Sequence, residues 1–276
     1  MRLRLTAVAA VLAIAAVGVG AGCGDDDDDN GGGGGGGDLG LIQEGQLLVG
    51  TDTPYPPFEI GQPPNITGYD IEVMNAIAQK LGLDVSYQDT SFDTIFRDLS
   101  QGKFDVALAA TTITPEREQK VDFSDPYYAA DQALVVAPGS DIKTVEDLAD
   151  KTVGAQDGTT GEDYANDETD ASDVRGFPEG PDAIQALKAG QVDATIIDQP
   201  VAVDALEKQG GIEVATTIPT GELYGIPTAQ DSDALREQIN KALKEMKDDG
   251  TLAGIYQKYF KTNPPQSVLT GTTQVQ

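Results

Sequence analysis

The sequence predicts an α/β fold built as two similar lobes that share a ligand cleft. From Leu47 onward, strand-like and helix-like hydrophobic patterns alternate, which is typical of α/β folds. Residues 99–108 are echoed by residues 187–196, since each segment combines a helix end, a glycine, an aspartate and a hydrophobic strand. Ligands of open α/β sheets bind beyond the strand ends, so the two echoed strands are expected to point at one cleft.

Each element is predicted from the spacing of its apolar residues. A 3.6-residue period marks helices, and short aliphatic runs between turn residues mark strands. In chain order, strands are expected at 47–50, 83–87, 104–109, 134–137, 152–155 and 192–197. Helices are expected at 70–81, 92–99, 183–189, 201–208, 235–246 and 252–260. Two more helices are expected without both bounds, one that begins at Pro115 and one that includes Tyr164. Thr144–Asp147 resembles a capping box, and Pro264 and Pro265 end the helical part.

Composition excludes several classes of function. Of the 276 residues, 39% are hydrophobic, so the chain is too apolar to be wholly disordered, and its length allows two lobes of about 100 residues. A net charge of −28 opposes nucleic-acid binding. The sequence has no histidine and one cysteine, Cys23, which rules out a Ser-His-Asp triad, a Cys-x-x-Cys site and an internal disulfide. No cofactor and no metal site are expected.

The first 22 residues are predicted to be a signal peptide. Two arginines precede an apolar run, Leu5–Val19, which is too short for a membrane span. Small residues and then Cys23 follow, an order that resembles a bacterial lipoprotein signal whose cysteine is lipidated. Gly20 stands where such signals carry leucine, so an ordinary cleaved signal is the alternative.

Residues 23–45 are predicted to be a disordered tether. Asp25–Asp29 and Gly31–Gly37 offer nothing to bury and combine self-repulsion with the backbone freedom of glycine. Together with a lipidated Cys23, this segment is expected to hold the protein at a membrane, outside the cytoplasm.

Polar side chains follow four of the expected strands. These strand ends deliver threonine hydroxyls, backbone amides, one arginine, acids and an aromatic residue. A guanidinium with N–H donors suits a carboxylate, and a carboxylate suits an ammonium group. The four strand ends therefore match what a zwitterionic ligand requires.

Five motifs resemble those of the bacterial extracytoplasmic solute-binding proteins of family 3, the amino-acid receptors of ABC importers. The resemblance covers about residues 47–260 and is specific because the motifs occur together. They are Val49-Gly-Thr-Asp-Thr-Pro-Tyr-Pro-Pro-Phe58, Gly68-Tyr-Asp-Ile71, Thr112-Ile-Thr-Pro-Glu-Arg117, Val121-Asp-Phe-Ser-Asp-Pro-Tyr-Tyr128, and Gly250-Thr with Tyr259-Phe260.

The resemblance implies a two-lobed, type II periplasmic-binding-protein fold with two hinge crossings. Lobe 1 would be discontinuous, and a loose tail would follow it. The implied parts are lobe 1 at 46–126 and 225–262, hinge crossings at 127–131 and 220–224, lobe 2 at 132–219, and the tail at 263–276.

The resemblance also implies a role for each site residue. Arg117 and Thr112, with Thr159 and Thr160, would hold the ligand carboxylate. Asp198 and the Ala110 carbonyl would bind the ammonium group, and Tyr55 and Phe92 would lie on either side of the ligand side chain. Asp52 would face the far end of that side chain, and Gln156 occupies a position that varies with ligand type in the family. Simpler roles stay open: Phe92 as a core residue, Arg117 in a surface ion pair, and the two aspartates as helix caps.

The function implied is delivery of a polar L-amino acid to the membrane permease of an ABC importer, without bond chemistry. Asp52 beside Tyr55 favours a cationic side chain, then glutamine. The alternative is a cyclohexadienyl dehydratase on the same fold, with Asp52 as proton donor. A third possibility is the sensing module of a signalling protein.

Overall fold

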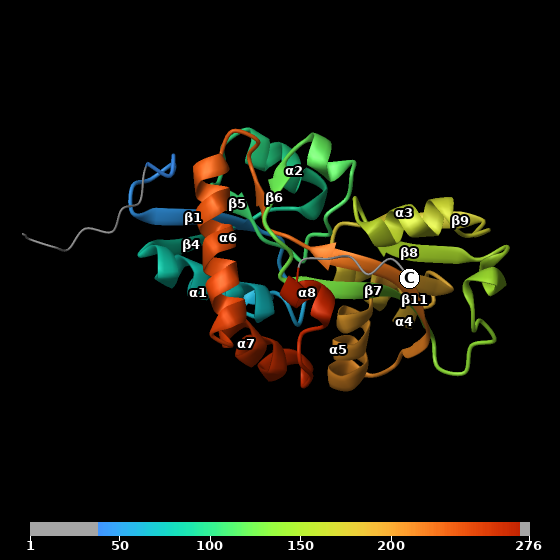
Figure 1. The fold of residues 1–276 in the computed structure, drawn as a ribbon. Coiled ribbons are helices and arrows are strands. Elements are labelled where there is room, and N and C mark those ends of the chain that lie inside the picture. Colours follow the sequence, from blue (N-terminus) through green and yellow to red (C-terminus); the bar gives the residue numbers. More distant parts are fainter. Residues whose placement is uncertain (1–37, 271–276) are drawn as a thin grey trace, which may run out of the picture. The chain divides into compact units, whose positions relative to one another are not determined.

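The computed structural model describes residues 38–270, which contain two five-stranded sheets (Figure 1). The first sheet is the centre of what we call lobe 1, and its strand order is β4-β1-β5-β12-β6. β1 is parallel to both of its neighbours, whereas β12 is antiparallel to β5 and β6. The elements of lobe 1 are β1 (Gln46–Thr51), the hairpin β2 (Ile60–Gln62) and β3 (Asn65–Thr67), α1 (Tyr69–Leu81), β4 (Asp84–Asp89), α2 (Phe92–Ser100), β5 (Val106–Ala107), the 3₁₀ turn η1 (Arg117–Gln119), β6 (Asp122–Phe123), β12 (Pro227–Thr228), α6 (Asp233–Asp248), α7 (Thr251–Phe260) and α8 (Gln266–Thr270).

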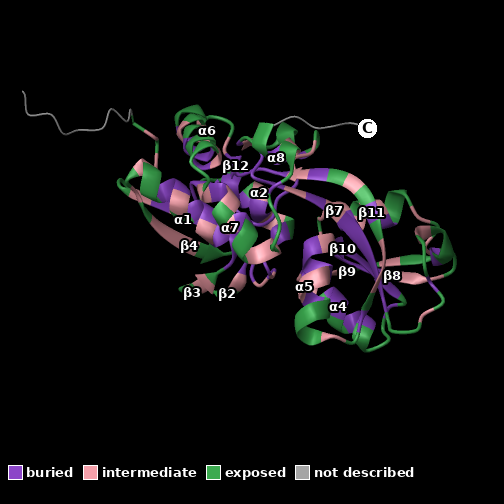
Figure 2. Cartoon of the chain, turned by 60° about the horizontal axis from the view of Figure 1, so that its bottom comes forward, coloured by how far each residue is buried: buried purple, intermediate pink, exposed green. Residues whose placement is uncertain are grey.

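The second sheet is the centre of lobe 2, with strand order β11-β7-β10-β8-β9. In Figure 1, α3 lies above this sheet and α5 lies below it. Its central strands are buried, as the purple ribbon in Figure 2 shows. The elements of lobe 2 are β7 (Tyr128–Val136), the 3₁₀ turn η2 (Val145–Leu148), β8 (Thr152–Gln156), α3 (Thr160–Asp167), β9 (Asp173–Phe177), α4 (Gly180–Lys188), β10 (Ala194–Asp198), α5 (Gln199–Gln209) and β11 (Glu213–Tyr224).

The repeated segment plays the same structural part in each lobe. Gly102 and Gly190 both have positive φ values, 70° and 68°, as expected for glycines that end helices. The Asp105 carboxylate then accepts the backbone N–H of Leu48, and the Asp193 carboxylate accepts that of Thr152, at 2.8 and 2.9 Å. The expected two-lobe repeat is therefore confirmed, and its aspartates tie neighbouring strands together.

The predicted hinge crossings lie side by side as paired parts of β7 and β11. Glu222–Tyr224 pairs with Tyr128–Ala130 in antiparallel register. The Tyr128 ring lies 4.7 Å from that of Phe260 on α7 and 5.0 Å from that of Phe58. These parts of β7 and β11 are thus packed against lobe 1 by a cluster of aromatic rings, and their role as a hinge stays a prediction.

Several elements differ from those expected. β9, β11 and the β2–β3 hairpin were not predicted, and Thr114–Glu116 precedes the single 3₁₀ turn η1 instead of a full helix. The capping box at Thr144–Asp147 is present but caps only η2. Within the tail expected to be loose at 263–276, α8 buries Val268 completely.

The N-terminal expectations fall mostly outside the described residues. The signal peptide at 1–22, Cys23 and the Asp/Gly run up to residue 37 all lie there. The last part of the expected tether is described, and it is not free: Leu39 and Leu41 pack on the core, and the N–H of Ile42 donates to Asp105 at 2.8 Å. Apolar leucines in this part of the tether explain the difference.

Candidate functional site

All ten predicted ligand-binding residues line one cavity between the two lobes. Lobe 1 supplies residues that follow β1 and β5, and lobe 2 supplies the ends of β8 and β10 with the start of α3. The lining comprises Asp52, Tyr55, Phe92, Ala110, Thr112, Arg117, Gln156, Thr159, Thr160 and Asp198, with Ala109 in addition. Nine of the ten follow strand ends as the sequence indicated, Phe92 came from the family resemblance alone, and the contacts of all ten with a ligand stay a prediction.

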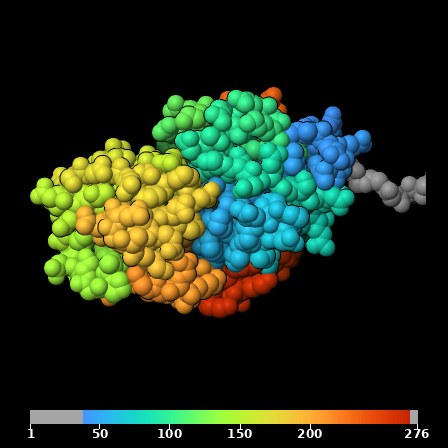
Figure 3. Space-filling view, turned by 180° about the vertical axis from the view of Figure 1, so that it is seen from behind, coloured from blue at the N-terminus to red at the C-terminus, as the bar shows by residue number. Residues whose placement is uncertain are grey.

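The cavity has a volume of only about 20 Å³, because side chains of the two lobes contact each other across it. That is room for about one water molecule. Figure 3 shows blue atoms of lobe 1 directly against gold atoms of lobe 2. A Cβ placed on Gly180 would lie 2.6 Å from the Tyr55 ring. An amino acid can enter only if the lobes separate.

Arg117 lies at the centre of the site and contacts both lobes. Its guanidinium donates to the carbonyl of Thr112 at 2.8 Å and to that of Gly158 at 3.1 Å. The rings of Phe92 and Phe96 lie 5.2 and 5.1 Å away, within cation–π distance. Burial lowers the pKa of Arg117, but its high starting value keeps it a cation. This buried, positioned cation is what a ligand carboxylate needs.

Asp198 is the acid nearest to Tyr55. The Tyr55 hydroxyl donates to Asp198 at 2.7 Å, and Gln132 Nε2 also donates to it. Burial, and then the charge of Glu222, raises the pKa of Asp198 to about 7. A ligand ammonium beside Asp198 would favour its ionised form.

Two residues of β7 and β11, Gln132 and Glu222, contact the cavity-lining residues and were not predicted. Glu222 accepts hydrogen bonds from the hydroxyls of Thr112 in lobe 1 and Thr160 in lobe 2. Gln132 donates to Glu222 at 2.9 Å as well as to Asp198. Glu222 therefore joins the two lobes through the hydroxyls predicted to hold a ligand carboxylate. The signal for it was its place in the predicted crossing 220–224.

Ala110 is held in an unusual backbone conformation at the cavity wall. Its φ is 45°, in the left-handed region that non-glycine residues rarely adopt. The buried Asp70 carboxylate accepts the Ala110 N–H at 2.9 Å and the Tyr127 hydroxyl at 2.8 Å. Burial raises the pKa of Asp70 to about 6. Asp70, which the sequence marked only as a helix start, thus positions a residue of the site.

The far end of the cavity is acidic. Gln156 Nε2 donates to Asp52 Oδ2 at 2.6 Å and to the Pro178 carbonyl at 3.2 Å. Asp52 is only 3% exposed, and burial raises its pKa to about 6 although the Gln156 hydrogen bond lowers it. Asp52 Oδ1 is buried with no hydrogen-bond partner among the described residues.

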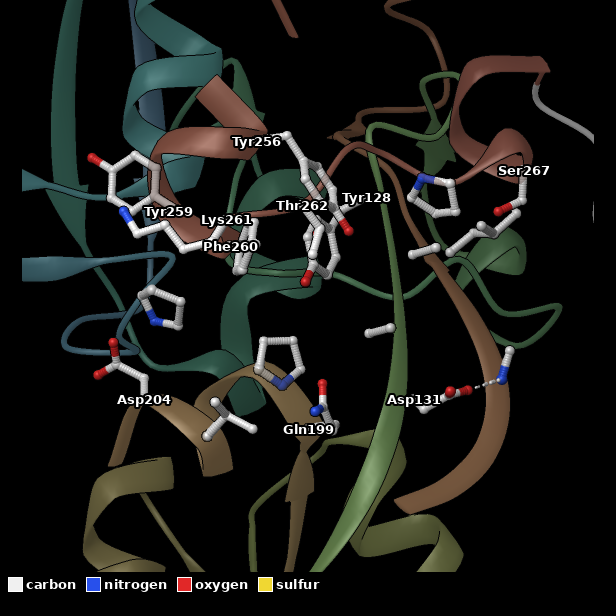
Figure 4. A pocket seen from close by; sticks show the side chains of 18 of the residues that line it. Tyr128, Asp131, Gln199, Asp204, Tyr256, Tyr259, Phe260, Lys261, Thr262 and Ser267 are labelled. Atoms are coloured by element: carbon white, nitrogen blue, oxygen red, sulfur yellow. Dashed lines mark hydrogen bonds between the residues drawn. The ribbon is translucent and has the colours of Figure 1, made fainter. Parts of the chain in front are cut away.

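A second, larger cavity lies beside the hinge and contains none of the predicted residues. Its volume is about 750 Å³, and α5, the hinge strands and the C-terminal helices line it. Figure 4 shows Tyr128, Tyr256 and Phe260 grouped on one side, and Asp131 accepting the N–H of Gly221 at 2.9 Å on the other. The lysine that lines it, Lys261, is exposed and donates to the Lys258 carbonyl, whereas Arg117 is buried, so we place the ligand in the smaller cavity.

Within residues 38–270, no helix is long and apolar enough to span a membrane. No group of three or more acidic, cysteine or histidine side chains in the same range could hold a metal ion.

The chain is similar to amino-acid-binding proteins over most of its length. The L-cystine-binding protein TcyJ of Escherichia coli (strain K12) is 33% identical over 226 residues, which is 79% of this chain and 84% of that one. An ancestral arginine-binding protein bound to arginine is 42% identical with a TM-score of 0.74, and covers 78% of this chain and 98% of its own. The ancestral amino acid-binding protein AncCDT-1, a precursor of cyclohexadienyl dehydratase, is 38% identical with a TM-score of 0.72. The match covers 78% of this chain and 95% of that one.

The family model of the bacterial extracellular solute-binding proteins, family 3, matches residues 47–262. The resemblance carried by the five sequence motifs is thereby confirmed, together with the two-lobed periplasmic-binding-protein fold. This chain belongs to family 3 of the bacterial extracellular solute-binding proteins.

Proposed function

We propose that this protein is the substrate-binding component of an ABC importer and carries a polar L-amino acid, with basic side chains preferred. One observation supports this most: a single cavity between the lobes is lined by one cation, Arg117, and by the acids Asp198 and Asp52. That arrangement is complementary to an amino acid with a positively charged side chain. The arginine bound to the ancestral relative has this chemistry.

Each end of the ligand has partners in the cavity. Arg117 would bind the carboxylate, and Thr112, Thr159 and Thr160 would add hydroxyls. Asp198 would accept the α-ammonium, at about 1.5–3 kcal/mol for each charge-assisted hydrogen bond. Tyr55 and Phe92 would flank the side chain, whose end would meet Asp52 and Gln156.

A thermal-shift panel of the common amino acids with ornithine tests this function. A ligand at 100 times its dissociation constant should add about 2.7 kcal/mol to the free energy of unfolding. We expect arginine, lysine, ornithine and histidine to raise the melting temperature most, glutamine next, and acidic or aliphatic amino acids least. If no amino acid stabilises the protein, the proposed function is wrong.

We further propose that Cys23 is lipidated and anchors the protein outside the cytoplasm, where it meets the permease. This rests on the signal-like residues 1–22, not on the described structure. Cys23→Ala should release the protein from membranes into the soluble fraction. Equal retention of the variant would contradict lipidation.

A dehydratase is the second candidate, because Asp52 is a buried acid with a pKa of about 6. Such a group could donate a proton to a substrate ring. AncCDT-1, a precursor of such an enzyme, is similar to this chain. Incubation with arogenate and prephenate decides between a transport receptor and a dehydratase. New aromatic absorbance would show an enzyme, and we expect no new absorbance.

A further inference from the structure

We propose that Glu179 is a second specificity-determining carboxylate, which acts with Asp52 from the opposite lobe to bind the cationic end of a ligand side chain. This rests on the proposed function and names a residue that the site did not include. Asp52 follows β1 in lobe 1, whereas Glu179 directly precedes α4 in lobe 2. A cation between them would be held from both sides of the cleft.

The backbone on both sides of Glu179 is fixed against the wall of the cavity. The preceding carbonyl, that of Pro178, accepts a hydrogen bond from Gln156, which also donates to Asp52. The following residue, Gly180, packs against the Tyr55 ring so closely that a Cβ there would lie 2.6 Å away. Glu179 itself does not line the cavity, but its two backbone neighbours contact Gln156 and Tyr55, which do.

The two carboxylates each carry an oxygen without a partner. Asp52 Oδ1 and Glu179 Oε2 are both buried without a hydrogen-bond partner among the described residues, although the Phe92 backbone N–H lies close enough to Asp52 to lower its pKa. A buried carboxylate oxygen is costly to leave unpaired. Because Asp52 is only 3% exposed and lines the cavity, its free oxygen is available to a donor that enters there.

The charges around this pair are all negative. The charges of Asp52, Asp89 and Asp182 raise the pKa of Glu179, and the charge of Asp89 also raises that of Asp52. Burial and this repulsion raise the pKa of Glu179 to about 7 and that of Asp52 to about 6. Within residues 38–270, none of these four acids forms an ion pair with a lysine or arginine. A guanidinium or ammonium group would supply the missing countercharge.

Calorimetric titration of Glu179→Gln with arginine, lysine and glutamine tests the proposal. Glu168→Gln is the matched control, since it removes the same charge from an exposed position of lobe 2. We expect Glu179→Gln to weaken arginine and lysine binding by about tenfold or more, and glutamine binding by less than about twofold. Glu168→Gln should leave all three affinities within about twofold of the parent.

A double-mutant cycle with Asp52→Asn shows whether the two carboxylates share one cation. If they do, the two losses in arginine affinity will not be additive. Should Glu179→Gln misfold, the parent alone gives a second readout: its ratio of arginine to glutamine affinity should rise between pH 5.5 and pH 8 as both acids ionise.

Three results would overturn the proposal. The first is an equal loss of arginine and glutamine affinity in Glu179→Gln, and the second is no loss at all. The third is stabilisation by calcium ions without any preference for basic amino acids, which would assign the carboxylate pair to a metal. If the parent binds no amino acid, the proposed function itself fails, which is a distinct outcome.

Discussion

Arg117 is the residue on which carboxylate recognition depends. Its planar guanidinium reaches both lobes through the carbonyls of Thr112 and Gly158 and lies over two phenylalanine rings. Lysine would keep the charge but lose the planar, bidentate geometry. We expect Arg117→Lys to weaken arginine binding by about tenfold or more and Arg117→Ala to nearly abolish it.

Calorimetry measures these affinities, and circular dichroism checks that both variants stay folded. Arg97→Ala is the control, because Arg97 is an exposed arginine of α2 that pairs with Asp98. Binding by Arg117→Ala as tight as that of the parent would show that the ligand carboxylate lies elsewhere.

Glu222 controls the protonation of Asp198. After burial, its charge is the largest cause of the raised pKa of Asp198, which is about 7. Glu222→Gln should therefore lower that pKa, so that Asp198 stays ionised and binds an ammonium at a lower pH. Glutamine is the suitable ligand, since its side chain has no charge to pair with Asp52.

We expect the pH of half-maximal glutamine affinity to fall by about one half to one unit in Glu222→Gln. Titrations between pH 5 and pH 8 measure it. An unchanged pH profile would show that Glu222 does not act through Asp198.

At the residue scale, the sequence predicted the side chains at strand ends and missed those that support them. Arg117, Asp52 and Asp198 could be found because ligands of open α/β sheets bind beyond the strand ends, where these three residues lie. Glu222 and Gln132 were missed, because Glu222 was assigned only to a hinge crossing and Gln132 lies inside the buried strand β7. The effect of Asp70 on Ala110 depends on a contact between residues 40 positions apart.

The first residue of α4, Gly180, contacts Tyr55 of the opposite lobe where the cleft closes. A methyl group on Gly180 would meet the Tyr55 ring at 2.6 Å, shorter than any ordinary carbon–carbon contact. Gly180→Ala should therefore keep the lobes apart and weaken ligand binding by about tenfold. Unchanged affinity would mean that this contact does not limit closure.

Gly254→Ala is the matched control for this substitution. Gly254 lies inside α7, and nothing lies within 4 Å of the position of its added Cβ. Because alanine is favoured over glycine in helices by up to about 1 kcal/mol, this variant should be slightly more stable and bind ligand normally.

Regular elements were predictable where local pattern and tertiary structure agree. α1 and α2 each repeat apolar residues at helical spacing, and both lie within a few residues of the expected ranges. β11 was missed because its register shifts twice and its burial does not alternate. α8 was missed because its single buried valine leaves no periodic signal.

For the whole molecule, burying acids has a cost that depends on pH. The pKa values of Asp52 and Asp70 are raised to about 6, and those of Asp198 and Glu179 to about 7. Between about pH 4 and pH 7, the folded protein therefore holds protons that the unfolded chain has released. The contribution of these four acids to the free energy of unfolding then falls as pH rises through this range.

We expect the melting temperature without ligand to be several degrees lower at pH 7.5 than at pH 5. Each kcal/mol lost from the free energy of unfolding lowers the melting temperature by about 2–4 °C in a chain of this size. Arginine should restore part of the loss at pH 7.5, because its charges pair with the ionised acids. Thermal unfolding followed by circular dichroism measures both. A melting temperature that rises from pH 5 to pH 7.5 would contradict the assignment of these buried acids.

The central claim is that the cavity between the lobes binds the zwitterion of a basic amino acid. Calorimetric titration of the parent protein with L-arginine, L-glutamine and L-glutamate at pH 7.5 tests it most directly. The charges of the cavity predict one site per chain, with arginine bound most tightly, glutamine more weakly and glutamate not measurably. Glutamate binding as tightly as arginine, or no heat with any of the three, would contradict the claim.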